Sequence, residues 1–298
     1  LDKINLFKLL RYNVIFNFSK KVSGLPLANK GFDFILSYSR SNFISYFIRP
    51  KYSKNFELIS TEKIDLKEFG IIIQGPVSNK NELNFLRETL KIYEKIFPKT
   101  LIIISTWENS YTEDLEDSEF IKIHKSRLPN EPGLANINYQ IKSTSNAIKI
   151  LKKEGIKNIL KTRTDCRLMK PNLKSYFLSL QKTFNSENSE YSRIFASSIA
   201  TCKYRIYGLT DILLFGKTDE MELYFKDETE SEILKNYSFE RIINETALMS
   251  EILLCARYLK NKGIKLDWTL EHWWYCLAKY FGIIDVNSLD FFWYKYDW

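Results

Sequence analysis

The stretch Gly70-Ile71-Ile72-Ile73-Gln74-Gly75-Pro76 decides the fold class. Its β-branched run has the length of a buried strand, and Gly-Pro ends that strand in a loop. An amphipathic helix is predicted over 81–97, where apolar residues recur at spacings of three and four before Pro98 stops it. A second apolar run over 100–106 predicts another buried strand. This order indicates two parallel strands joined by a helical crossover.

The same alternation continues along the chain to residue 163. A short strand is predicted over 120–123, a helix over 138–153 that is closed by Gly155, and a fourth strand over 158–163. In the second half, two strands are expected over 194–200 and 212–215, and two helices over 219–225 and 239–259. The predicted fold class is therefore α/β, with a mainly parallel sheet covered by helices.

The N-terminal 65 residues differ from the rest of the chain. Of the net charge of +8, most lies in residues 1–60, where ten Lys and Arg stand against three acidic residues and alternate with Leu, Ile and Phe. We expect a helical extension over 1–65 and one main domain over 66–298. Basic segments of this kind bind anionic membrane surfaces, and the alternative is a solvated helix face that packs on the main domain. No nucleic-acid module follows, so we expect no nucleic-acid partner.

Composition narrows the class of protein further. A hydrophobic content of 45% excludes a disordered chain, and no run approaches the ~18 apolar residues of a membrane-spanning helix. The four cysteines lie far apart in sequence, which argues against a zinc knuckle or a redox pair and favours a reducing cytoplasm. Residues 290–298 include six aromatic residues, and we expect them to pack against the body or a partner.

Candidate binding residues follow three of the predicted strands. In an open α/β sheet, ligands bind beyond the carboxyl ends of the strands. Trp107 could stack on a base there, and Gln74 could recognise the edge of that base. For each residue the alternative is an ordinary loop position, but their joint placement favours a ligand site. The candidates at these strand ends are Gln74, Gly75, Pro76, Thr106, Trp107, Arg163, Asp165 and Arg167.

The run Arg163-Thr164-Asp165-Cys166-Arg167 places one carboxylate between two guanidiniums. Mg²⁺ and Mn²⁺ are commonly held by one or two carboxylates together with phosphate oxygens of a substrate, so Asp165 is a candidate metal ligand. Arg163 or Arg167 could contact a diphosphate. The alternative is a salt-bridged Asp165 that holds two strand ends together.

Three motifs in this order resemble the WavE family of lipopolysaccharide-synthesis proteins: Ile-Ile-Gln-Gly-Pro at 72–76, Ile-Ile-Ser-Thr-Trp at 103–107 and Lys-Thr-Arg-Thr-Asp at 161–165. The segment from Pro132 to Ser143 is similar to that family too, and the resemblance covers about residues 68–260. It implies a GT-A-like, Rossmann-type glycosyltransferase with Asn138 and Gln140 at the nucleotide sugar. It also implies a divalent metal on the acidic strand end, here Asp165, where this chain has one acid instead of a pair.

Further site residues are expected in the second half. Asp211 is the first candidate for a general base, with Glu245 as its rival. Their alternatives are a turn-capping acid and a first-turn helix acid, respectively. In some GT-A enzymes a late histidine completes the metal shell, a role that would fall on His272. A histidine among aromatic residues is more often packed in a core.

The combined hypothesis is a cytoplasmic glycosyltransferase at the inner face of the inner membrane. It would move a sugar from a nucleotide-sugar donor to a glycan or a lipid-linked glycan of lipopolysaccharide or capsule. Two alternatives stay open: a nucleotidyl or phosphosugar transferase, and a non-catalytic scaffold of a polysaccharide-assembly complex. The chain contains no P-loop, no Gly-x-Gly-x-x-Gly and no Gly-x-Ser-x-Gly.

Overall fold

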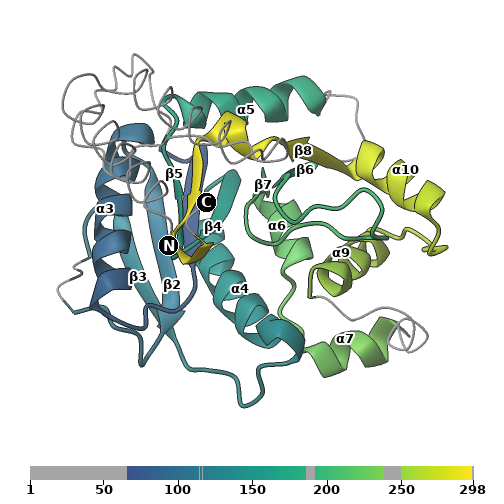
Figure 1. The fold of residues 1–298 in the computed structure, drawn as a ribbon, viewed down its shortest axis with the longest axis horizontal. Coiled ribbons are helices and arrows are strands. Elements are labelled where there is room, and N and C mark those ends of the chain that lie inside the picture. The colour runs from purple at the N-terminus through teal and green to yellow at the C-terminus, as the bar shows by residue number, and fades with distance from the viewer. Residues whose placement is uncertain (1–65, 114, 116, 186–191, 238–249, 297–298) are drawn as a thin grey trace, which may run out of the picture. The chain divides into compact units, whose positions relative to one another are not determined.

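The computed structural model describes residues 66–113, 115, 117–185, 192–237 and 250–296 (Figure 1). The predicted basic extension over 1–65 lies outside these residues. At the centre is a seven-stranded, mostly parallel sheet, which confirms the predicted α/β class. Across the sheet, the strands are β3 (Ile121–Ser126), β2 (Leu101–Trp107), β1 (Phe69–Gln74), β4 (Asn158–Arg163), β7 (Leu214–Lys217), β6 (Ile194–Ser197) and β8 (Phe281–Ile284). Of these strands, β7 alone runs antiparallel to both its neighbours.

Helices cover both faces of the sheet, because side chains of β1 alternate between two hydrophobic clusters. Ile71 and Ile73 join the cluster that contains α3 (Lys80–Ile96) and α5 (Leu173–Phe184). Ile72 joins the cluster on the opposite face. That second face is covered by α4 (Ile137–Lys153), α6 (Thr218–Tyr224), α7 (Glu230–Tyr237), α9 (Ser250–Asn261) and α10 (Leu270–Tyr280). Burial on both faces explains the continuous apolar runs of β1 and β2.

The first half of the chain follows the predicted elements closely. Helix α3 begins where the side chain of Asn79 accepts hydrogen bonds from the amides of Asn81 and Glu82, and it ends at Ile96, shortly before Pro98. The third strand is longer than predicted, at six residues. In the second half the sequence did not reveal α5, α7, α10, β8 or the two strands β5 and β9, and the predicted helix over 239–259 is described only from Ser250.

The C-terminal segment folds back on the domain. After η2 (Val286–Leu289), strand β9 (Phe291–Trp293) pairs antiparallel with β5 (Cys166–Leu168), and η3 (Tyr294–Tyr296) follows. Phe291 and Phe292 are buried there. This pairing confirms that the aromatic C-terminal segment packs against the body. Within the described part of the chain, no helix combines the length and the hydrophobicity needed to cross a membrane.

Candidate active site

The connections of the sheet create a crevice between β1 and β4. From β1 the chain passes through α3 to β2 and on to β3, and α4 then carries it back to β4 on the other side of β1. In doubly wound sheets, ligands bind at such a switch point, beyond the carboxyl ends of the strands. Here the two strands end in register at Gln74 and Arg163.

A glycine turn brings these two strand ends together. The amide of Gly75 donates to the Ser105 carbonyl at 3.1 Å, and the amide of Thr164 donates to the Gln74 carbonyl at 3.1 Å. The Thr164 hydroxyl donates to the carbonyl of Pro76 at 2.9 Å. Gly75 has φ +138°, and a Cβ at this position would lie 2.7 Å from Thr164 Oγ1. The turn therefore requires glycine for two independent reasons.

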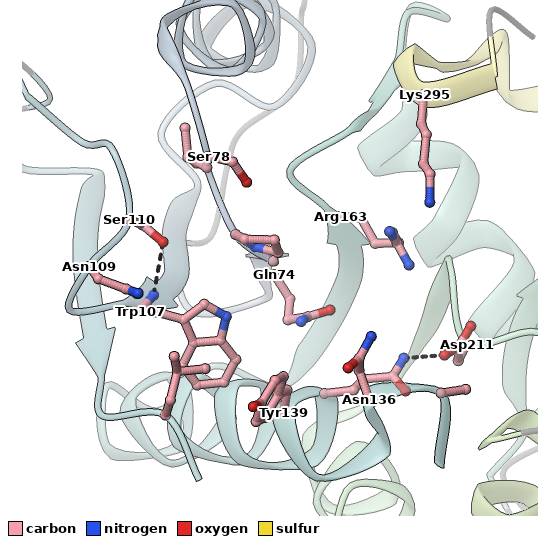
Figure 2. Close-up of a pocket in the computed structure, with 16 residues that line it drawn as sticks. Gln74, Ser78, Trp107, Asn109, Ser110, Asn136, Tyr139, Arg163, Asp211 and Lys295 are labelled. Carbon is pink, nitrogen blue, oxygen red and sulfur yellow. Dashed lines mark hydrogen bonds between the residues drawn. The ribbon is translucent and has the colours of Figure 1, made fainter. Parts of the chain in front are cut away.

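A cavity of about 660 Å³ opens at this switch point (Figure 2). That volume lies in the range of small-molecule and cofactor sites. Its lining includes most of the strand-end residues expected from the sequence, together with residues of α4 and of the C-terminal segment. The lining residues that matter most for the chemistry are Gln74, Trp107, Tyr139, Gln140, Arg163, Asp211 and Lys295.

One side of the cavity is aromatic. The rings of Trp107 and Tyr139 lie 5.5 Å apart at an angle of 61°. Ser110 fixes the end of β2, because its hydroxyl accepts from the Thr106 hydroxyl at 2.6 Å and from the Trp107 amide at 3.3 Å. Thr106 itself is fully buried and does not line the cavity, so its predicted contact with a nucleotide is replaced by this support of Trp107.

The opposite side presents a carboxylate, that of Asp211. The side-chain amide of Gln140 donates to this carboxylate, and Lys161 Nζ donates to the main-chain carbonyl of Asp211. Burial lowers the pKa of Lys161 to about 8. Asp211 is thus held from α4 and from β4 at once. Lys161 was not among the predicted site residues, although a lysine within the apolar strand β4 is a signal that could have identified it.

Arg163 is oriented by Asp165. Its Nε donates to one carboxylate oxygen of Asp165 at 2.9 Å and its Nη2 donates to the other at 3.1 Å. The indole Nε1 of Trp293 donates to the same carboxylate at 3.0 Å. Burial raises the pKa of Asp165, but the hydrogen bonds and the charge of Arg163 outweigh burial and hold this pKa below its ordinary value. Arg163 lines the cavity, whereas Asp165 lies behind it.

The predicted metal site of Asp165 and His272 does not fit this geometry. Both oxygens of Asp165 are already engaged by Arg163. His272 lies in α10, where its Nδ1 is 2.7 Å from the Tyr207 hydroxyl and 3.2 Å from the Asp267 carboxylate. Among the residues that the structure describes, no cluster of three or more His, Cys, Asp or Glu side chains could hold a metal ion.

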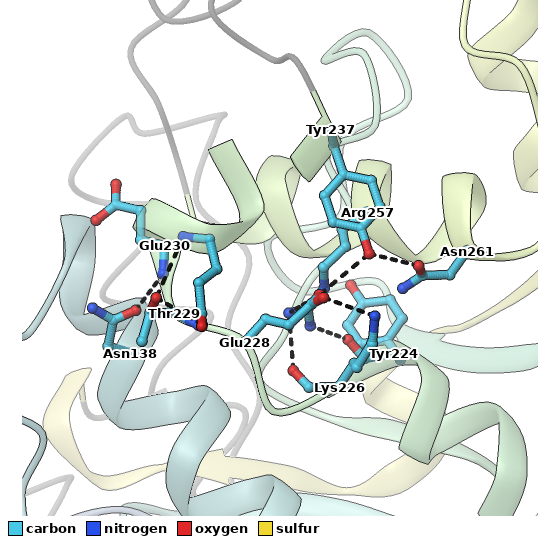
Figure 3. A network of polar contacts seen from close by, with 10 residues as sticks. Asn138, Tyr224, Lys226, Glu228, Thr229, Glu230, Tyr237, Arg257 and Asn261 are labelled. Atoms are coloured by element: carbon cyan, nitrogen blue, oxygen red, sulfur yellow. Dashed lines mark hydrogen bonds and ion pairs between the residues drawn. The ribbon is translucent and has the colours of Figure 1, made fainter. Parts of the chain in front are cut away.

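Two further predicted residues serve the scaffold instead of the cavity. Arg167 is 1% exposed and donates to the Thr89 hydroxyl at 2.9 Å and to the Phe85 carbonyl at 2.8 Å, which ties β5 to α3. Asn138 accepts from the Glu230 amide at 2.7 Å and so joins α4 to α7 (Figure 3). Neither lines the cavity at the switch point. The rival base Glu245 lies outside the described residues.

The family model for WavE lipopolysaccharide synthesis matches residues 69–272. The chain belongs to the WavE family. This match covers more than half of the chain and confirms the resemblance seen in the sequence motifs. Membership of the WavE family implies a part in lipopolysaccharide synthesis. No curated protein matches the chain significantly. The matched residues include the cavity residues from Gln74 to Asp211. Lys295 lies beyond the end of the match.

Proposed function

We propose that this WavE protein is a GT-A-like glycosyltransferase that uses a nucleotide-sugar donor. One observation carries the proposal: a single cavity at the switch point combines an aromatic surface, a fixed guanidinium and a fixed carboxylate. A nucleotide sugar needs partners of these three kinds, for its base, its phosphates and the reaction of its sugar. The family's part in lipopolysaccharide synthesis supports the same substrate class.

The donor would lie across the carboxyl ends of β1, β2 and β4. Its base would contact Trp107 and Tyr139, which form the aromatic side of the cavity, and the amide of Gln74 would recognise the edge of the base. Its diphosphate would reach Arg163, because a guanidinium matches the geometry of phosphate oxygens. The sugar would then lie near Asp211, on the side of the cavity opposite the aromatic rings (Figure 2).

For a transfer with inversion, Asp211 would be the general base. The acceptor oxygen forms a bond to the anomeric carbon, and the bond from this carbon to the diphosphate oxygen breaks. The bonding electrons stay on the diphosphate, and the acceptor proton passes to the Asp211 carboxylate. Gln140 and Lys161 support this role because their hydrogen bonds fix both the side chain and the main chain of Asp211.

The acceptor in this proposal is a glycan or a lipid-linked glycan of the bacterial surface. The basic residues of segment 1–60 would bring the protein to the inner face of the inner membrane, where lipid-linked acceptors lie. Removing the basic charge of this segment by Lys and Arg to Gln substitutions would then weaken binding to anionic vesicles and leave binding of soluble nucleotides unchanged.

A thermal-shift screen tests the donor class. The purified chain is heated with UDP-, GDP-, CDP- and CMP-linked sugars, each with and without Mg²⁺ or Mn²⁺. A ligand that binds the folded state alone stabilises it by about 2.7 kcal/mol at a hundredfold excess over its Kd. We expect one nucleotide class to raise the melting temperature. If no nucleotide does so under any condition, the transferase proposal fails and the scaffold alternative replaces it.

Asp211→Asn tests the assignment of the base. We expect turnover of the identified donor to fall by a factor of about 10² to 10⁴, the usual contribution of a general base. Donor affinity and melting temperature are expected to stay near those of the wild type, because asparagine has nearly the same shape. Single-turnover kinetics with the donor and an acceptor glycan provide the measurement. Wild-type turnover in Asp211→Asn would remove Asp211 from the mechanism.

A further inference from the structure

The C-terminal segment supplies a residue to the cavity. Lys295 lies in η3 and lines the cavity together with residues of the strand ends, of α4 and of the loops beside them. Its side chain extends from the C-terminal turn toward the guanidinium of Arg163 (Figure 2). The WavE match ends at residue 272, so the family match gives Lys295 no role. Two cations from distant parts of the chain therefore face the same part of one cavity.

The segment that carries Lys295 is firmly attached beside Arg163. Strand β9 pairs with β5 in register, with Cys166 opposite Trp293. The Tyr294 amide donates to the main-chain carbonyl of Asp165 at 2.8 Å, and the Trp293 indole donates to the carboxylate of Asp165 at 3.0 Å. Asp165 thus holds Arg163 through its carboxylate and holds the C-terminal segment through both its carboxylate and its main chain.

Charge compensation of a diphosphate is the chemistry that this pair can perform. In a metal-dependent site, a divalent ion on an acidic strand end contributes two positive charges to the phosphates. Here the carboxylate at the strand end is engaged by Arg163 and Trp293, and the guanidinium and ammonium of Arg163 and Lys295 together contribute two positive charges. The planar guanidinium can bind two phosphate oxygens, and the ammonium acts as a point charge.

We infer that Arg163 and Lys295 form a diphosphate site that binds a nucleoside diphosphate without a divalent cation. This inference rests on the proposed function, because it specifies how the donor and the leaving group are held. It predicts that the second phosphate carries much of the affinity, since the two cations act on the diphosphate. It also predicts that the C-terminal turn is part of the binding site.

Isothermal titration calorimetry on the full chain in EDTA tests this inference. The probes are UDP, GDP and CDP, each compared with its monophosphate. The variants are Lys295→Ala, Lys295→Arg and the control Lys170→Ala. Lys170 is an exposed lysine two residues beyond β5 that lies over the ring of Tyr176 and does not line the cavity. Because Lys295 is exposed too, each variant is expected to melt at the wild-type temperature.

We expect one diphosphate to bind in EDTA at least about tenfold more tightly than its monophosphate. Lys295→Ala should weaken the diphosphate on the order of tenfold and the monophosphate far less. Lys295→Arg should restore binding, and Lys170→Ala should match the wild type.

Two results would overturn the inference and leave the transferase proposal intact. One is diphosphate binding that appears when Mg²⁺ or Mn²⁺ is added and disappears in EDTA. The other is an equal affinity of Lys295→Ala and Lys170→Ala for the diphosphate. A chain that binds no nucleotide with or without metal would instead refute the proposed function itself, and the inference with it.

Discussion

Arg163 and Arg167 lie four residues apart and have different surroundings. Arg163 ends β4 and lines the cavity, whereas Arg167 lies in β5 and is buried against α3 with the ring of Phe85 4.1 Å from its guanidinium. From the sequence, either could contact a diphosphate. In one continuous strand, residues four apart would face the same side. The structure separates the two arginines because the turn at Thr164 and Asp165 interrupts this alternation between β4 and β5.

Substituting each arginine with methionine should therefore affect different properties. Arg167→Met removes the donor to the Thr89 hydroxyl and one of the two side-chain donors to the Phe85 carbonyl, and we expect the free energy of unfolding to fall by about 2–4 kcal/mol. Nucleotide affinity should stay within twofold. Arg163→Met should instead weaken nucleotide binding by at least tenfold. Urea denaturation and calorimetry measure the two effects, and a loss of affinity in Arg167→Met equal to that in Arg163→Met would contradict this division of roles.

At the scale of elements, the turn that joins β1 to α3 controls the shape of the cavity floor. Gly75 lies where β1 and β4 approach each other, and the Thr164 hydroxyl occupies the space that a side chain at residue 75 would need. Any change in this turn must move Gln74 and Pro76, which both line the cavity. The turn thus couples the local backbone geometry directly to ligand binding.

Gly75→Ala should destabilise the fold and weaken nucleotide binding together. A Cβ 2.7 Å from Thr164 Oγ1, added to a positive φ, should cost about 1–3 kcal/mol of unfolding free energy. Gly263→Ala is a matched control, because Gly263 also has a positive φ, +78°, but a Cβ there would meet no atom within 4 Å. Chemical denaturation and calorimetry on both variants separate the steric effect from the dihedral effect. A normal nucleotide affinity in Gly75→Ala would argue against this coupling.

At the scale of the whole molecule, one buried amine links stability to pH. Lys161 is fully buried in β4, and burial lowers its pKa to about 8, below its ordinary value of 10.5. The unfolded chain then binds more protons than the folded chain between about pH 8 and pH 10.5, so this residue makes stability rise with pH across that window. Below pH 8 the folded protein bears the full cost of burying the charge.

Comparison with Lys161→Met isolates this contribution. We expect the unfolding free energy of the wild type to rise, relative to that of the variant, by about 3 kcal/mol between pH 8 and pH 10.5. All other titrating groups are common to the two proteins and cancel in the difference. Urea denaturation of both proteins at several pH values in this window gives the curves. Parallel curves would show that the pKa of Lys161 is not lowered in the folded state.

The elements that could be predicted from sequence are those with long, strongly periodic segments. From Phe69 to Arg163 the apolar runs and the amphipathic helices place the four strands β1 to β4 and the helices α3 and α4. Strands β5 and β9 have three residues each and show no period, so their pairing across more than a hundred residues leaves no local signal. For the same reason no local signal indicated the bond from Trp293 to Asp165, and for Asp165 the prediction was a metal ligand, with a salt bridge as the alternative.

The pairing of β9 with β5 also has a consequence for the order in which the protein becomes functional during synthesis. Cys166 emerges from the ribosome long before Trp293, and contacts between such distant residues form late. Of the cavity residues described here, Lys295 is the last to be translated. A nascent chain that has folded its sheet still lacks one of the two cations of the proposed diphosphate site, so we expect tight nucleotide binding to begin after Lys295 has been translated.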